Sequence, residues 1–144
     1  MDRRSWIKRL GFLASGGLAA WTGQAGARQP GTTGSDRSGM IILYCDLAVK
    51  PDKEQQMLEV FHRKFRPAAE RFKGFIDLKI LKFDHLVQGK PLPASINYRF
   101  ELAYESLALQ QVWVHSSTHQ ALWPLMAETL SNPDDFQVLV FNNA

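Results

Sequence analysis

The sequence predicts an α+β domain in which helices cover one face of a four-stranded antiparallel sheet. Three observations predict it. Four segments have the pattern of strands, two regions between them have apolar residues every three or four positions, and their order is β-α-β-β-α-β. This order is the split arrangement of a ferredoxin-like layer. A chain of 144 residues with 45% hydrophobic content is sufficient for one packed domain.

The first strand and the first helix are expected between residues 40 and 74. The run MIILYCDLAVK is β-branched and aromatic, and Pro51 stops it. The apolar spacing that follows predicts a helix from about Asp52 to Lys73. Pro67 is expected to kink or restart this helix because it has no backbone N–H, and Gly74 is expected to end it.

Two further strands are expected in the middle of the chain. FIDLKILKF predicts the second strand, with Ile76, Leu78 and Ile80 on one side. DHLVQGKPLPAS then predicts a loop. INYRFELAY alternates as a third strand, and its shared face contains Ile96, Tyr98, Phe100, Leu102 and Tyr104.

The second helical region is expected to consist of two helices. Ser106 fits the start of a helix over LALQQVWV, and Ser116 or Ser117 fits the start of another over THQALWPLMAETL. Pro124 is expected to mark a break or restart in the latter. FQVLVF follows a turn-like SNPDD and closes the chain as the fourth strand.

The first and last strands are apolar on both sides. Opposite their core-facing residues lie Ile42 and Tyr44 on the first strand and Leu139 and Phe141 on the last. The helices can cover only one face of the sheet, and the other would expose an apolar patch larger than soluble monomers usually carry. We therefore expect a homodimer that packs through the sheet faces, a dimeric α+β barrel.

The amino-terminal 27 residues have the layout of a cleavable secretory signal: a charged head, the apolar run LGFLASGGLAAW and a small-x-small site that ends at Ala27. This run is too short and too rich in Gly and Ala for a stable membrane anchor. The stretch DRRSWIK resembles a twin-arginine export signal, which predicts a periplasmic or secreted protein. Residues 28–39 are expected to form a flexible linker, and residues 40–144 the domain.

The charge and cysteine content exclude two further classes. Beyond residue 27 the chain contains 13 basic and 13 acidic residues, and no basic stripe indicates a nucleic-acid surface. Cys45 is the only cysteine, so no intrachain disulfide can form. A buried thiol is expected there, and an interchain bridge is the alternative.

Two histidines four positions apart, His115 and His119, lie in VWVHSSTHQALW. On a continuous helix they would share a face and could both reach a metal ion. The expected junction between two helices breaks this geometry, and neither His62 nor His85 has a fixed spacing to the pair. We therefore expect no metal site, and each histidine is expected at a surface or at the junction.

Three segments together resemble the antibiotic biosynthesis monooxygenase (ABM) domain family: VKPDKEQQMLEVF, RPAAERFKGF and YESLALQQVWVHSSTHQALW. The resemblance covers about residues 40 to 141. It implies dimeric α+β barrels with a pocket between the helices and the sheet of each subunit. It also implies that some members oxygenate aromatic molecules without metal or flavin, that some degrade haem, and that others have no established substrate.

The resemblance implies a cofactor-independent monooxygenase that acts on a small aromatic or phenolic substrate. The substrate would be buried and deprotonated, and hydrogen bonds from Trp113, His119 or a tyrosine would hold the anion that reduces oxygen. Trp113 and His119 are the catalytic candidates, with plain core packing as the alternative. The candidates for substrate contact are Tyr44, Tyr104, His115 and Trp123.

Two alternatives accompany this hypothesis. Haem-degrading relatives resemble the chain at Trp113, but they place an asparagine near Cys45 and an axial histidine near Trp123. His119 lies one helical turn from Trp123 and is the alternative iron ligand. The other alternative is a non-enzymatic dimer that binds a small apolar ligand, because a fold alone does not specify chemistry.

Overall fold

The computed structural model describes residues 39–144. These residues all belong to the second of two units into which the chain divides, Met1–Asp36 and Arg37–Ala144. The predicted export signal, residues 1–27, lies outside the described residues, as does the predicted linker apart from Gly39. Among the described helices, none has the length and apolar character that a membrane span requires.

The predicted ferredoxin-like α+β fold is confirmed. Four antiparallel strands form one sheet in the order β2-β3-β1-β4. This order puts the first and third strands of the chain in the centre and leaves β2 and β4 as edges. The strands are β1 (Ile41–Leu47), β2 (Phe75–Lys82), β3 (Tyr98–Tyr104) and β4 (Val138–Asn142).

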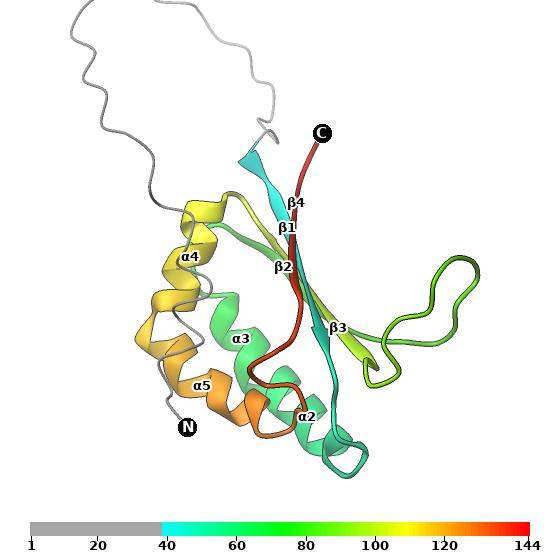
Figure 1. Ribbon diagram of the computed structural model, residues 1–144. Helices are drawn as coiled ribbons and strands as arrows, with labels where there is room; N and C mark the ends of the chain where they lie inside the picture. Colours follow the sequence, from blue (N-terminus) through cyan, green and yellow to red (C-terminus); the bar gives the residue numbers. More distant parts are fainter. Residues whose placement is uncertain (1–38) are drawn as a thin grey trace, which may run out of the picture. The chain divides into compact units, whose positions relative to one another are not determined.

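The described helices form one layer on one side of the sheet (Figure 1). The first helical region contains a 3-10 turn η2 (Pro51–Lys53), α2 (Glu54–Val60), a π-helical turn η3 (Phe61–Phe65) and α3 (Arg66–Ala69). The second contains α4 (Leu107–His115) and α5 (Ser117–Ala127). The predicted division of this region is confirmed: Ser116 between the two helices has extended backbone angles, and its hydroxyl accepts the N–H of His119 at 3.1 Å.

The first helix accommodates Pro67 by a change of register. Pro67 has no N–H for the carbonyl four residues earlier, and directly before it the Arg66 N–H donates to the Phe61 carbonyl, five residues back. The helix is shorter than predicted, since it ends at Ala69, and residues 70–74 form turns that reach Gly74 at φ +84°. The predicted break at Pro124 is wrong, because α5 continues through this exposed position, where the missing hydrogen bond lies on the solvent side.

The core lies between the helices and one face of the sheet. On β3 the predicted shared face is buried, and Phe100 and Leu102 lie opposite Cys45 and Leu43 of β1. The prediction that Ile76 shares a side with Leu78 is wrong. A register shift between Phe75 and Asp77 makes Ile76 an extra residue in β2, and its side chain is 45% exposed.

The other face, which no described helix covers, is called the open face below. The expected apolar residues lie on its β1 and β4 half, where Tyr44 packs edge-on against Phe141 at 5.5 Å. The β2 and β3 half is charged. There Arg99 forms two hydrogen bonds to the buried carboxylate of Asp46, at 2.6 and 3.1 Å. Most charged side chains of the open face therefore lie on its β2 and β3 half, where Leu81 is also exposed, while Asp46 of β1 is buried in its pair with Arg99.

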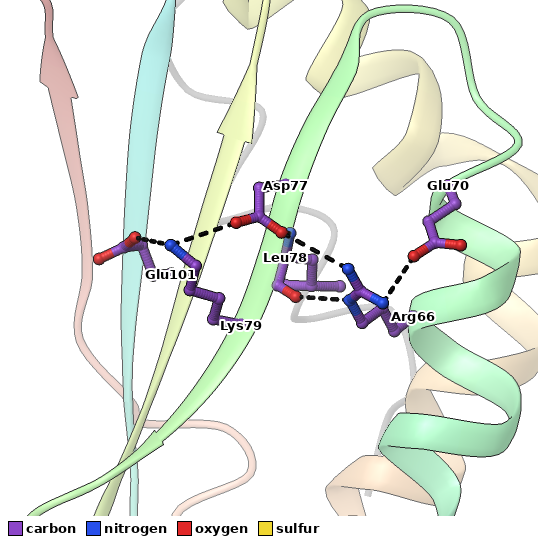
Figure 2. Close-up of polar contacts among 6 residues, drawn as sticks. All are labelled: Arg66, Glu70, Asp77, Leu78, Lys79 and Glu101. Atoms are coloured by element: carbon purple, nitrogen blue, oxygen red, sulfur yellow. Dashed lines mark hydrogen bonds and ion pairs between the residues drawn. The ribbon is translucent and has the colours of Figure 1, made fainter.

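Ion pairs continue across this charged half to the edge of the sheet (Figure 2). Lys79 lies between two carboxylates, 3.2 Å from Asp77 and 3.4 Å from Glu101. From α3, Arg66 donates to the Leu78 carbonyl at 2.9 Å and forms an ion pair with Glu70. Because Arg66 occupies a backbone acceptor of β2, it protects this edge strand against pairing with another chain.

Gly74 is expected to be intolerant of a side chain. A Cβ atom there would lie 2.5 Å from Leu109 Cδ1 and 2.9 Å from Leu109 Cβ, and its φ is +84°. Gly89 is a matched control, because its φ is +105° but nothing lies within 4 Å of an added Cβ. Gly74→Ala should lower the free energy of unfolding by about 1–3 kcal/mol more than Gly89→Ala. Urea unfolding of both variants measures this difference, and equal losses would contradict it.

Candidate functional site

Aromatic rings from the helices and the sheet meet between the two layers. Phe65 of η3 lies at the centre, with its ring centroid 5.5 to 6.1 Å from four others, on Phe100, Trp113, His119 and Trp123. Phe72 packs against Trp113 at 4.9 Å and Phe136 against Trp123 at 5.4 Å, while Phe61 extends the contacts outward from Phe100 at 5.3 Å. The His119 cluster is defined as Phe65, Phe72, Phe100, Trp113, His119, Trp123 and Phe136.

His119 lies inside this cluster and is only 3% exposed. The Trp113 ring lies 4.9 Å away and perpendicular to the imidazole, and the Trp123 ring is parallel to it at 6.0 Å. Burial, and to a smaller extent the nearby His115, lowers the pKa of His119 to about 4. The imidazole is therefore neutral at pH 7 and can both accept and donate one hydrogen bond.

Tyr104 lies on the same side of the sheet, at the end of β3, with its ring 6.0 Å from Phe75. It is fully buried, and burial raises the pKa of its hydroxyl to about 12. Among the described residues this hydroxyl has no hydrogen-bond partner. Leaving a buried donor unsatisfied costs about 1–3 kcal/mol, so Tyr104 is a candidate to hydrogen-bond a ligand in the layer between helices and sheet.

The remaining two candidates lie elsewhere. His115 is exposed at the end of α4, where its Nε2 is 3.2 Å from the Gln111 Oε1. Tyr44 lies on the open face, with the Arg99 guanidinium 5.4 Å above its ring. The structure thus brings Trp113, His119 and Trp123 into one cluster, leaves Tyr104 on the same side, and separates Tyr44 from them by the thickness of the sheet. Substrate binding by these residues stays a prediction.

Sequence reasoning did not single out Phe65 or Phe136. Phe65 was one of several residues in an apolar stripe, and the stripe alone does not show which member meets the histidine. Phe136 is the first residue of the predicted fourth strand FQVLVF, but β4 begins only at Val138, and the alternation alone does not show that the Phe136 ring meets Trp123. The number of aromatic residues in each element could have indicated the cluster, because rings from η3, β3, α4 and α5 can meet only between the helices and the sheet.

The surroundings of the cluster are apolar except for a few polar side chains, and these carry no charge. The buried polar side chains of the helical regions are Gln110, His119 and Thr129, and none of them carries a charge at pH 7. Two indoles and one imidazole can orient an aromatic molecule through ring stacking and single hydrogen bonds. An anion would lack a cationic partner there, so the layer favours a neutral ligand.

Metal and haem chemistry need groups that these residues do not present. Among residues 39–144, no three His, Cys, Asp or Glu side chains are arranged to hold a metal ion. Haem needs a ring nitrogen that faces open space, whereas aromatic rings enclose the His119 imidazole. Cys45 is a buried thiol whose pKa burial raises to about 12. These residues do not fit haem in this conformation.

No protein-family model matches the sequence, and no curated protein matches it. Solved structures do match. A protein from Jannaschia sp. CCS1, described as a dimeric ferredoxin-like protein of unknown function, is 15% identical with a TM-score of 0.61, and the match covers 73% of this chain and 100% of that one.

Two further similar structures carry the description "putative antibiotic biosynthesis monooxygenase". The protein from Bordetella bronchiseptica is 20% identical with a TM-score of 0.58, over 74% of this chain and 98% of that one. The protein from Caulobacter crescentus CB15 is 15% identical with a TM-score of 0.57, over 75% and 92%. At these identities the similarity shows that the fold is shared.

The buried imidazole predicts a loss of stability in mild acid. The folded pKa of His119 is about 4 and the unfolded value about 6.5, so the unfolded chain binds more protons between these values. As the pH falls from 6.5 to 4, the free energy of unfolding should drop by about 3 kcal/mol more in the native protein than in His119→Phe. Urea unfolding at a series of pH values measures this.

His115→Gln is the matched control for this experiment. It removes the exposed neighbour that lowers the pKa of His119 only secondarily, so most of the acid sensitivity should remain. Parallel stability profiles for the native protein and His119→Phe would show that the imidazole is not buried in its neutral form.

Proposed function

We propose that this protein is an exported, dimeric monooxygenase of the ABM type that oxidises a small aromatic or phenolic molecule without a cofactor. One observation carries the proposal: a neutral imidazole, His119, lies among aromatic rings between the helices and the sheet. The shared fold of the "putative" monooxygenases and the segments that resemble the ABM family support it. The proposed substrate is neutral, since the buried polar groups there are uncharged.

The proposed reaction needs no external reductant. The substrate is either an aromatic with a benzylic CH₂ that becomes a carbonyl, or a phenol whose ring CH and hydroxyl carbon both become carbonyls. One atom of O₂ enters the carbonyl formed at the CH₂ or the ring CH, and the other leaves as water together with two hydrogens. The two hydrogens come from the CH₂ in the first case and from the ring CH and the hydroxyl in the second. The substrate supplies all the electrons that O₂ takes up. The protein's contribution is then to bind the substrate away from water and to stabilise the oxygen on which negative charge develops.

A hydrogen bond from His119 is proposed to act on that oxygen, and Tyr104, at the end of β3, is a second candidate on the same side of the sheet. Because the pKa of His119 is about 4, this imidazole is a weak base at pH 7, and we assign it the role of a hydrogen-bond partner. Tyr104 offers a buried hydroxyl that has no other partner among the described residues. Trp113 and Trp123 provide the flat apolar surfaces against which an aromatic ring stacks.

Substrate entry requires one of the enclosing rings to move. Phe136 is the proposed gate, because it is half-buried, packs on Trp123 at 5.4 Å and belongs to neither a helix nor a strand. Residues 131–137 around it connect α5 to the edge strand β4. Hydrogen bonds from Ser131 and Asn132, and from Asp46 to Gln137, hold this segment, so the proposed movement is that of the Phe136 ring and not of the backbone.

A homodimer through the open faces is part of the proposal. Two similar structures, from Jannaschia sp. CCS1 and Bacteroides fragilis NCTC 9343, are described as dimeric. In this chain, the apolar half of the open face, with Phe141 among its exposed residues, needs a cover. A second copy offers the same apolar half as a matching surface.

Oxygen uptake tests the proposed activity. The native protein should consume oxygen with at least one member of a panel of phenols, quinols and anthrones, and His119→Ala should lower this rate by about 10²-fold or more. His115→Ala is the matched control, because this histidine is exposed and outside the cluster, and its rate should equal that of the native protein.

Three outcomes would count against the proposed activity or its site. A native protein that is inactive on the whole panel but binds a member, seen as quenched tryptophan fluorescence, would favour the ligand-binding alternative. Equal rates for the native protein and His119→Ala would contradict the assigned site. A Soret shift on mixing with haemin, lost in His119→Ala, would favour the haem alternative instead.

Export tests the proposed location. In a bacterium with twin-arginine transport, the full chain with a carboxyl-terminal epitope should appear outside the inner membrane. Replacing both arginines, Arg3→Lys with Arg4→Lys, should retain it in the cytoplasm. Arg9→Ser is the control, since Arg9 is outside the pair. Native protein retained in the cytoplasm, or export unchanged by the double substitution, would contradict this route.

A further inference from the structure

The connection between β2 and β3 forms a long projection that is called the arm below, residues 83–97. Figure 1 shows it extending from the end of the sheet, away from the helices. Its apolar side chains Phe83, Leu86 and Val87 are exposed, Val87 to 88%. Around Gly89 nothing lies within 4 Å of an added Cβ. Several apolar residues together on a projecting loop indicate a surface that contacts another molecule.

The arm continues the open face. The Phe83 N–H donates to the Asn97 carbonyl at 2.8 Å, so the ladder between β2 and β3 extends one step beyond Lys82 and Tyr98. Successive strand residues alternate between faces, and therefore Leu81 and Phe83 share the side of Lys79, which is the open face. A partner that covers the open face consequently also meets the base of the arm.

The open face alone is small for a stable dimer. It has four strands, and β1 and β3 contain seven residues each. At about 4.8 Å between strands and about 3.3 Å per residue, the sheet measures roughly 19 by 23 Å, or about 440 Å². A specific interface typically buries about 800 Å² on each partner. A flat footprint is smaller than the accessible surface of the same patch, and the exposed apolar side chains of the arm add further surface that a partner can bury.

The charge pattern selects how two open faces pack. A two-fold axis parallel to the strands would place β2 of one copy on β4 of the other, and so the charged half on the apolar half. This would bury Asp77 and Lys79 against apolar residues such as Phe141. An axis across the strands places β4 on β4 and β2 on β2. The two apolar halves then face each other, and so do the two charged halves.

An axis across the strands also reverses the strand direction. The arm projects beyond the end of β2, and the reversed copy therefore presents the start of its own β2 to that arm. Ile76 lies at this start and is 45% exposed. Exposed apolar side chains at opposite ends of one strand thus become neighbours in the dimer.

We propose that the arm of each subunit lies across a second copy of this chain and packs Leu86 and Val87 against the region of Ile76 on its β2. The inference rests on the homodimer of the proposed function and adds the contact that gives this dimer its area and its orientation. It does not depend on the chemistry of the His119 cluster.

Dissociation of the full chain tests the arm. Leu86→Ser with Val87→Ser should raise the dimer dissociation constant at least tenfold, as measured by sedimentation velocity over a dilution series. Val112→Ser is the matched control: Val112 is 59% exposed but lies on α4, in the helical layer. Its dissociation constant should equal that of the native protein. Circular dichroism checks that all variants are folded.

Cross-linking tests the orientation. In a Cys45→Ser background, a short bifunctional thiol reagent should link Val87→Cys of one subunit to Ile76→Cys of the other when the two single variants are mixed. The pair of Val87→Cys with Val112→Cys should stay unlinked. Linked Val87→Cys homodimers in place of the mixed product would show that both arms lie at the same end, and would overturn the orientation.

The outcomes separate the two proposals. A monomeric native protein at micromolar concentration would overturn the homodimer and the arm together. A stable dimer whose dissociation constant is unchanged by the arm substitutions would overturn the arm alone. Oxygen uptake by a monomer would support the proposed chemistry while both assembly proposals fail.

Discussion

A single helical layer on a four-stranded sheet is the constraint on which the rest of this structure depends. It gives β1 and β3, the central strands, two different environments: the helix side buries Leu43, Phe100 and Leu102, and the open side carries Tyr44 and the Asp46–Arg99 pair. A sheet protected by helices on one face needs either polar residues or a partner on the other. This chain has polar residues on one half of that face and apolar residues on the other.

Burial on the helix side keeps the imidazole of the candidate site neutral and also shuts the site off from solvent. The rings that lower the pKa of His119 to about 4 are the rings that shield it from solvent. A more accessible imidazole would be better hydrated, and its pKa would lie nearer the ordinary value. Neutrality and access therefore oppose each other, and catalysis at His119 depends on a movement that admits a substrate without admitting bulk water.

The sequence predicted the elements well because their signals are local. Alternation identified β3, and serine caps placed both α4 and α5 at Ser106 and Ser116. The wrong predictions concern features that depend on contacts with other elements and not on the local sequence. Ile76 left the helix side because β2 gained an extra residue against β3, and the continuation of α5 through Pro124 depended on the exposure of that position. Residue spacing reports neither of these facts.

The site was less predictable, since it forms from contacts between elements. The sequence names Trp113 and His119 as candidates, and their rings do meet, but it does not distinguish Phe65, which contacts both, from the rest of its apolar stripe, and Tyr44 faces away from them. The open face shows the same limit. The apolar residues of β1 and β4 predict its apolar half. Its charged half depends on the strand register, which places Lys79 of β2 beside Glu101 of β3.

The two faces of the sheet are coupled through β3. Phe100 contacts the His119 cluster, and its neighbours Arg99 and Glu101 belong to the open face. Any cover on the open face holds these neighbours and so restrains Phe100. Opening of the cluster must then come from the helix side, and the Phe136 ring, in the irregular segment 131–137, is the proposed moving part, although hydrogen bonds to Asp46 and Ala48 hold the backbone of that segment. Association and substrate entry can thus occur together, since they use opposite sides of one rigid strand.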